Sequence, residues 1–158
     1  MIRFLIFSDT HGRKGRMEEI VADHPEAQYV IHLGDCVGDT KNLPDINNEI
    51  TLYNVRGNCD SSFLAEEDGE IMVSGKRIFF THGHKYSVKS GLERLIFEGN
   101  RRGADVVFFG HTHSARNHYL DGMYVFNPGS LSRPREGRGS YGIMDIYNGQ
   151  ISLNIVEV

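Results

Sequence analysis

The sequence predicts a single α/β domain over residues 1–158, and three features support that prediction. Near-continuous apolar runs recur along the chain and are typical of strands that are buried on both faces. Stretches with helical periodicity alternate with these runs, which gives a βαβ order. In the last third, paired strand patterns are joined by Asp-Gly and Asn-Gly, the turn sequences typical of β-hairpins.

The composition is that of an ordinary globular protein, and it excludes several functional classes. Hydrophobic residues make up 39% of the chain and the formal net charge is −4, so we expect no nucleic-acid partner and no anionic membrane surface. No apolar run approaches the roughly 18 residues of a membrane span. The N-terminal run leads directly into an acidic motif and lacks signal-peptide features, so we expect a cytoplasmic protein. Two cysteines do not make a disulfide scaffold.

The first half of the chain predicts three strands and one helix. The strands are the apolar runs at 2–8, 29–33 and 50–55. Met17, Ile20 and Val21 have helical spacing and predict an amphipathic helix over Lys14–Asp23. His32 lies inside the second strand and is interpreted as a packed or hydrogen-bonded histidine, with a direct role in the site as the less favoured alternative. The polar stretch at 38–48 predicts a loop with room for one short helical turn.

The second half predicts further strands, one helix and two hairpins. Strands are expected at 70–73, 77–81 and 106–110, and hairpins at 116–127 and 141–158. A helix is expected over 90–103, with Leu92, Leu95 and Ile96 on one face and Gly103 as its C-cap. Arginine and glycine fill a loop at 133–139 between the hairpins.

A polar cluster follows each of five predicted strands. The clusters are Asp9-Thr10-His11, Gly34-Asp35, Gly57-Asn58-Cys59-Asp60, His82-Gly83-His84 and Gly110-His111-Thr112-His113. In open α/β sheets the ligand site lies beyond the carboxyl ends of the strands, so we expect the clusters to converge. The His-Thr-His pair alone fits turn residues as well as metal ligands. Five clusters of one kind favour a metal site.

The donor set fits two metal ions better than one. Carboxylate, imidazole and amide groups supply oxygen and nitrogen, and no thiolate set is present for a structural zinc site. The number of donors exceeds the needs of a single ion. Two cations roughly 3.5–4 Å apart are a standard clamp for in-line displacement at phosphorus, where a hydroxide that bridges the metals attacks. The sequence therefore predicts a dinuclear phosphoesterase.

These clusters resemble the motifs of the calcineurin-like metallophosphoesterases, and the resemblance covers essentially the whole chain. The short length, Gly-Asn-Cys-Asp and Asn127-Pro128-Gly129-Ser130 are similar to the YfcE-type phosphodiesterase branch, which is related to Vps29. The resemblance implies a four-layer α/β/β/α sandwich with mixed sheets. It also implies one metal site of Asp9, His11 and His113, a second of Asn58, His82 and His111, and a bridging Asp35. Mn²⁺ is the metal it most suggests, with Ni²⁺, Co²⁺, Fe or Zn²⁺ as alternatives.

Cys59 departs from the family pattern. Many members carry a histidine there, which is thought to stabilise the phosphoryl group or protonate the leaving oxygen, and a thiol cannot offer a positive charge. We therefore expect good rates on activated diesters and poor rates on alkyl leaving groups. Asp60 is expected either to lie behind the ligands or to have only a turn role. His84 is expected either to approach the substrate or to lie behind the ligands. The candidate catalytic residues are thus Asp35, Asn58, Cys59, Asp60 and His84.

The expected function is metal-dependent hydrolysis of a small phosphate ester, with a phosphodiester as the leading substrate. A phosphomonoesterase or nucleotide phosphatase is the alternative among enzymes, and a non-catalytic Vps29-like scaffold is the alternative outside them. The intact ligand positions argue against the scaffold. Arg133, Arg135 and Arg138 either receive a phosphate or belong to a solvated loop. The C-terminal hairpins offer edges through which a homo-oligomer could pair.

Overall fold

Two five-stranded mixed sheets pack face to face in the computed structural model, which describes residues 1–158. The first sheet has the order β10-β9-β1-β2-β3, formed by Gln150–Glu157, Ser140–Tyr147, Ile2–Phe7, Tyr29–His32 and Thr51–Asn54. The second has the order β4-β5-β6-β8-β7, formed by Asp68–Val73, Lys76–Thr81, Val106–Phe108, Met123–Asn127 and Arg116–Leu120. The neighbours β1, β2 and β3 run parallel, as do β5, β6 and β8.

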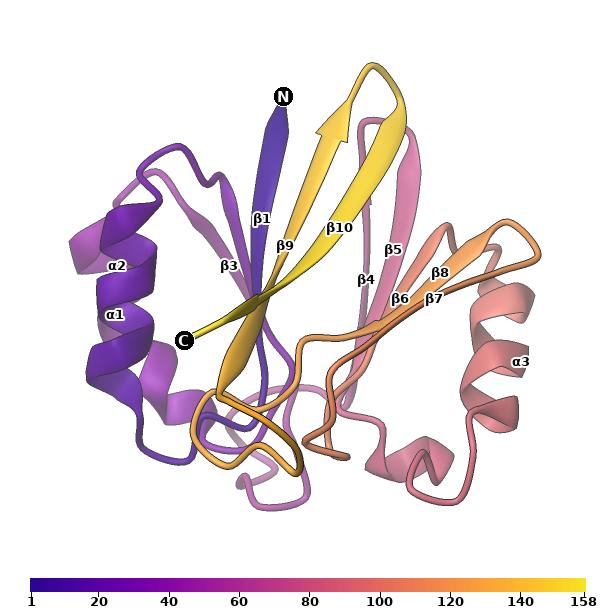
Figure 1. Ribbon diagram of the computed structural model, residues 1–158, viewed down its shortest axis with the longest axis horizontal. Coiled ribbons are helices and arrows are strands. Elements are labelled where there is room, and N and C mark those ends of the chain that lie inside the picture. Colours follow the sequence, from indigo (N-terminus) through magenta and orange to yellow (C-terminus); the bar gives the residue numbers. More distant parts are fainter.

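Helices cover the outer face of each sheet, which confirms the predicted four-layer α/β/β/α sandwich (Figure 1). On the first sheet lie α1 (Lys14–Asp23) and α2 (Leu43–Ile46), and on the second lies α3 (Glu93–Arg102). Two short 3-10 helices, η1 (Val37–Asn42) and η2 (His84–Tyr86), complete the set. No helix is both long and apolar enough to cross a membrane.

The structure differs from the sequence prediction in two helical segments. The loop expected over 38–48 is largely helical, because η1 runs directly into α2. Pro44 occupies the first turn of α2, where its missing N–H breaks no hydrogen bond, and Leu43 is fully buried. The helix expected from residue 90 begins at Glu93, and it ends as predicted at Gly103, whose φ of 66° is that of a left-handed C-cap.

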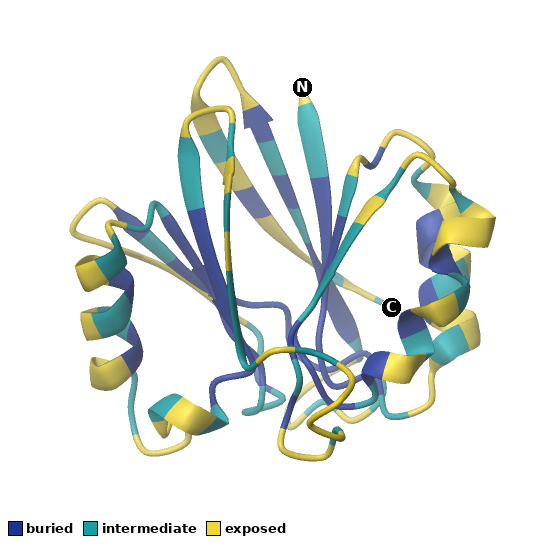
Figure 2. Ribbon diagram, turned by 180° about the vertical axis from the view of Figure 1, so that it is seen from behind, coloured by how far each residue is buried: buried dark blue, intermediate teal, exposed yellow.

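Three apolar layers hold the sandwich, and β1 contributes to two of them. Successive side chains of a strand point to opposite faces. Phe4 and Ile6 therefore pack between the sheets, while Leu5 and Phe7 pack beneath α1 and α2. All four are fully buried, which explains the continuous apolar run. The third layer lies between the second sheet and α3 and includes Phe79, Leu95, Val107, Phe109 and Val125. Figure 2 shows the buried residues along the inner strands and the exposed ones on the outer helix surfaces.

The centre of the first sheet joins distant parts of the sequence. Strand β1 pairs in parallel with β2 and antiparallel with β9, so that Ile2 lies opposite Ile146. The Arg3 guanidinium donates two hydrogen bonds of 2.8 Å to the Asp145 carboxylate, across a sequence separation of 142 residues. The sheet thus depends on the pairing of β1 with β9, which come from opposite ends of the chain.

The segments that follow β1, β3, β5 and β6 gather at one end of the molecule. In Figure 1 they lie at the lower end, whereas the β4–β5 and β9–β10 turns lie at the upper end. This follows from the parallel direction of the inner strands within each sheet. The polar clusters predicted at strand ends are therefore brought to one edge of the sandwich.

Gly99 lets α3 lie close to the second sheet, and its replacement tests the packing. An alanine Cβ there would lie 2.6 Å from Val107 Cγ2 and 2.8 Å from Met123 Sδ. Replacing glycine by alanine in a helix contributes about 1 kcal/mol through higher helix propensity. Overpacking a core costs about 1–3 kcal/mol, and Val107 cannot move away easily because its strand is fully buried. We expect Gly99→Ala to lower the free energy of unfolding by about 1 kcal/mol in urea denaturation.

Asn100→Ala is the matched control, because residue 100 is the exposed neighbour in the same helix. It gains helix propensity without a clash, so we expect unchanged or slightly higher stability. A stability gain for both variants would contradict the close approach of α3.

Candidate metal centre

Seven polar side chains converge where the strands end. Asp9 and His11 follow β1, Asp35 follows β2, Asn58 follows β3, His82 follows β5, and His111 and His113 follow β6. They form two overlapping groups of donors, and His82 Nε2 at the centre of the second group lies 3.6 Å from Asp35 Oδ2 and 3.9 Å from Asp9 Oδ1. The structure thus brings together all of the residues that the sequence nominated as metal ligands.

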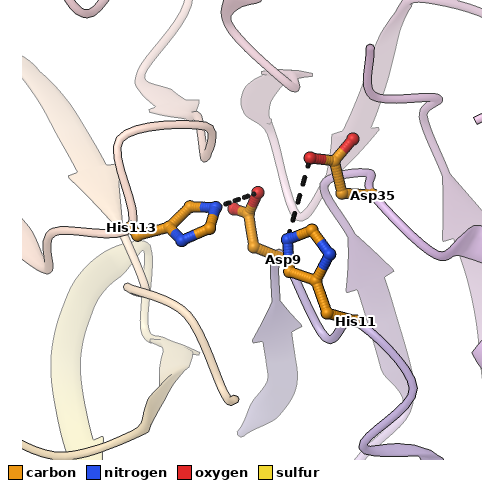
Figure 3. Close-up of side chains that lie close together, drawn as sticks. All are labelled: Asp9, His11, Asp35 and His113. Carbon is orange, nitrogen blue, oxygen red and sulfur yellow. Dashed lines mark ion pairs between the residues drawn. The ribbon is translucent and has the colours of Figure 1, made fainter. Parts of the chain in front are cut away.

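The first group consists of Asp9, His11, Asp35 and His113 (Figure 3). One donor atom from each lies within 4.8 Å of the others. His113 Nε2 is 3.1 Å from Asp9 Oδ1, and His11 Nε2 is 3.9 Å from Asp35 Oδ2. Two carboxylates and two imidazoles facing a common centre are a ligand set that suits a first-row divalent cation.

The second group is centred on His82. Its Nε2 lies 3.1 Å from Asn58 Oδ1 and 3.1 Å from His111 Nδ1. The same nitrogen is 3.6 Å from Asp35 Oδ2. Asp35 therefore faces both groups, with one oxygen directed toward His11 on one side and His82 on the other.

Backbone carbonyls orient the rings of His82 and His113 by binding the ring nitrogens that face away from the site. His82 Nδ1 donates to Leu33 O at 2.7 Å, and His113 Nδ1 donates to Arg133 O at 2.8 Å. A carbonyl only accepts, so in the neutral ring the proton lies on Nδ1 and Nε2 presents a lone pair to the centre. Histidine ligands of metals are commonly oriented by such a second hydrogen bond.

Two donor atoms of the first group are buried without a hydrogen-bond partner, Asp9 Oδ1 and His11 Nε2. An unsatisfied buried polar atom costs about 1–3 kcal/mol. A cation coordinated by this group would satisfy both atoms at once. The residues present therefore fit a bound metal ion.

The surroundings favour the metal-binding protonation states of Asp9 and His111, whereas they favour the protonated form of His113. Burial opposes the ionisation of Asp9, but His113, His82 and the Ser8 hydroxyl outweigh it and lower the pKa of Asp9 to about 2. Burial, reinforced by His82, lowers the pKa of His111 to about 4. The Asp9 carboxylate raises the pKa of His113, so protons compete with a metal at that ring.

Most of the ligands have an unusual backbone conformation. The φ angles of Asp9, His11, Asp35, His111 and His113 are 52°, 42°, 59°, 67° and 56°. A non-glycine residue in this left-handed region costs roughly 1–2 kcal/mol. Such strain concentrates at functional sites, where the surrounding structure enforces it. The sequence carries no signal for this feature, because these residue types also occur in ordinary turns.

Two glycines let the ligand loops touch. A Cβ added to Gly57 would collide with Asp35 Oδ1, and one added to Gly110 would collide with Ser8 Oγ. Both glycines directly precede a ligand, Asn58 or His111. The Gly-Asn and Gly-His pairs therefore reflect close approach between loops as well as the ends of strands.

Asp60 ties together two of the ligand loops. Its Oδ2 accepts from the backbone N–H groups of Asp35 and Gly57 at 2.7 and 2.8 Å, and its Oδ1 accepts from that of Val37 at 3.0 Å. Both oxygens are thus occupied by backbone groups. Asp60 is a positioning residue that lies behind the ligands, which is the first of the two roles expected for it.

Cys59 is exposed beside the second group. Its backbone N–H donates to Asp35 Oδ1 at 3.0 Å. Partial burial, followed by the Asp35 carboxylate, raises the pKa of the thiol, which therefore remains neutral. His84 lies next to His82 and His111, with ring centroids 5.4 and 6.1 Å away, and its Nδ1 is buried without a hydrogen-bond partner.

Further polar residues hold the ligand loops from behind. His32 is fully buried and bonded to Thr10 Oγ1 at 3.0 Å, as its interpretation as a packed histidine predicted. Asp39 Oδ2 accepts from Thr10 Oγ1 at 2.7 Å, and Asn127 Nδ2 donates to Gly110 O at 3.1 Å. Asp39 and Asn127 were not among the predicted site residues. The one sequence signal at this segment is Asn-Pro-Gly-Ser at 127–130, and the family resemblance implies that this loop lies near the site.

Removing the negative charge of Asp60 tests its positioning role. In Asp60→Asn, at least one of the three backbone N–H groups faces an amide NH₂ and loses its hydrogen bond. The remaining bonds go to a neutral acceptor, whereas hydrogen bonds to a charged acceptor contribute about 1.5–3 kcal/mol each. We expect the free energy of unfolding to fall by about 1–2 kcal/mol and metal affinity to fall about tenfold or more, measured by denaturation and calorimetry. Glu66→Gln, an exposed change in the same loop, is the control and should alter neither. Unchanged metal affinity in Asp60→Asn would refute this role.

Comparison with known proteins identifies relatives over nearly the whole chain. The calcineurin-like phosphoesterase superfamily domain matches residues 2–149. The chain is 34% identical over 155 residues to the probable metallophosphoesterase YsnB of Bacillus subtilis, covering 97% of this chain and 89% of YsnB. It is 30% identical over 169 residues to the phosphodiesterase YfcE of Escherichia coli K12, covering 92% of this chain and 88% of YfcE.

Solved structures share the fold over nearly the whole chain. A predicted phosphoesterase from Streptococcus pneumoniae has a TM-score of 0.84 at 21% identity and covers 99% of this chain and 89% of its own. Vps29 of Entamoeba histolytica, solved in complex with Zn²⁺, has a TM-score of 0.76 at 19% identity and covers 99% of each chain. The superfamily domain matches residues 2–149, and the structure has the converging strand-end clusters and the four-layer sandwich expected for it. The chain therefore belongs to the calcineurin-like phosphoesterase superfamily.

Proposed function

We propose that this chain is a phosphodiesterase that binds two divalent metal ions. The observation that carries the proposal is the position of Asp35 Oδ2, which lies 3.9 Å from His11 Nε2 and 3.6 Å from His82 Nε2. A carboxylate oxygen between two sets of imidazole donors is suited to bridging two cations. The E. coli relative named a phosphodiesterase supports a diester as the substrate.

The ligands would divide between the two ions. Asp9, His11 and His113 would hold the first, Asn58, His82 and His111 the second, and Asp35 both. When bound, two divalent cations polarise the phosphoryl oxygens and supply an activated water for in-line displacement. The oxygen and nitrogen donors accept several divalent metals, and we propose Mn²⁺ first, with Ni²⁺, Co²⁺, Fe or Zn²⁺ as alternatives.

The residues of the chain set the geometry for that reaction. Asp60 holds the Asp35 backbone, and the carbonyls of Leu33 and Arg133 hold the rings of His82 and His113. Asn58 is exposed, and it marks the open side from which a substrate reaches the ligands. Because the donors are held in place before a substrate arrives, little reorganisation accompanies the reaction.

Metal removal and restoration test the proposal directly. We expect chelated protein to be inactive on aryl phosphodiesters, activity to return with Mn²⁺, and calorimetry to give about two equivalents bound.

Asp35→Asn should lower kcat/KM at least about 100-fold, because the amide is a poor bridge. Asp45→Asn, an exposed change in α2, is the matched control. Two bound metals without activity on monoesters or diesters would refute the enzyme and favour a binding scaffold. A preference for monoesters would favour the phosphomonoesterase alternative.

The exposed, neutral thiol of Cys59 predicts a steep dependence of rate on the leaving group. A neutral thiol is a weak proton donor to the departing oxygen and carries no positive charge, so rates should fall strongly as the pKa of the leaving alcohol rises. Cys59→His should flatten that dependence and raise rates on alkyl esters at least about tenfold, since general acids contribute about 100-fold or more. Cys59→Ser is the control and should leave the slope unchanged. A flat slope in the unmodified protein would contradict the prediction.

A further inference from the structure

A trough leads away from the ligands His111 and His113. A cavity of about 230 Å³ is lined by both histidines together with Lys89, Thr112 and Arg135. A second cavity of about 310 Å³ is also lined by Lys89, Thr112 and Arg135, and it extends past Arg116. The two cavities share three lining residues and therefore lie next to each other, and we call them together the trough, whose inner end is at the candidate metal centre.

Three cations line this trough, and none of them forms an ion pair. Lys89 and Arg135 border both cavities, and Arg116, whose Nη1 donates to Ala115 O at 2.8 Å, borders the outer one. The only carboxylate in the lining is the exposed Glu136. By contrast, several cations around α3 are paired, among them Arg77, Lys85, Arg101 and Arg102. Unpaired cations that face one cavity are a typical arrangement for binding an anion.

Part of the outer cavity's lining is apolar. It is formed by Val88, Leu92 and Phe109. Val88 and Phe109 are 4% and 1% exposed and belong to the core between the second sheet and α3, so this part is rigid. A ligand that fills the cavity therefore needs an apolar or ring-shaped body and an anionic group.

We propose that this trough binds the leaving group of the substrate and selects phosphodiesters whose leaving group carries a second phosphate on a ring-shaped body. The inference rests on the proposed phosphodiesterase function and specifies its substrate class. In the reaction a P–O bond to water forms and the P–O bond to the leaving group breaks. The products are a phosphomonoester and an alcohol that carries its own phosphate. Arginine favours phosphate here, because its planar fork binds phosphate oxygens through two hydrogen bonds.

Two chromogenic diesters test this selection. The first is ethyl 4-nitrophenyl phosphate, and the second is the same diester with a phosphonomethyl group on its nitrophenyl ring. We expect Mn²⁺-loaded protein to prefer the second at least about tenfold in kcat/KM, and Arg116→Gln to remove that preference without slowing the first substrate. Arg116 suits the test because it borders only the outer cavity. Arg138→Gln is the control. It removes one positive charge from a different cavity, and the variant should keep the preference for the second diester.

A binding measurement separates this inference from the proposed activity. Calorimetry on metal-free protein would use the nitrophenol that carries the phosphonomethyl group, which needs no catalysis. We expect Arg116→Gln to raise the Kd for this nitrophenol at least about tenfold, and Arg138→Gln to leave the Kd unchanged. Equal Kd values for the unmodified protein and Arg116→Gln, or an equal loss of kcat/KM on both diesters, would overturn the inference. Hydrolysis of neither diester together with Arg116-dependent binding would instead refute the phosphodiesterase function alone.

Discussion

The candidate metal centre depends on the packing of one sheet against the other. Neither sheet holds a complete donor group by itself. The first group takes Asp9, His11 and Asp35 from loops of the first sheet and His113 from the second, and the second group is divided in the same way. The apolar layer between the sheets, including Phe4, Phe108 and Phe126, therefore sets the distances between donors as well as the stability of the fold. A repacking of that layer would change the site even though no ligand is touched.

The site concentrates features that oppose folding. Several ligands have left-handed backbone, and two donor atoms are buried without partners. These features persist because the surroundings over-determine them: Asp60 binds three backbone amides, two carbonyls orient histidine rings, and glycines permit the loops to touch. The rigid apolar layers beneath the loops supply the stability that such a site needs.

The sequence predicts the positions of the donors well, because each follows an apolar run and the ends of parallel strands meet at one edge. The four-layer arrangement came from the family resemblance, since periodicity alone does not show which faces of two sheets meet. The sequence allowed only one short helical turn in 38–48, and the extent of the helical structure there is not evident because Leu43 is the main sign of burial in a polar stretch. The role of Asp60 and the unpaired state of Arg116 depend on how loops from distant segments approach one another, and no local pattern encodes that.

The pairing of β1 with β9 also bears on how the chain folds. Strands β1, β2 and β3 form a contiguous parallel unit within the first third of the chain, but one side of β1 is completed only by a strand more than a hundred residues away, at a separation of 142 residues for Arg3 and Asp145. Closing a loop of that length precedes any gain from the contact, so such pairings form slowly. Until β9 docks, β1 presents an apolar, unpaired edge. An edge of this kind favours self-association of partly folded chains, in competition with the docking of β9.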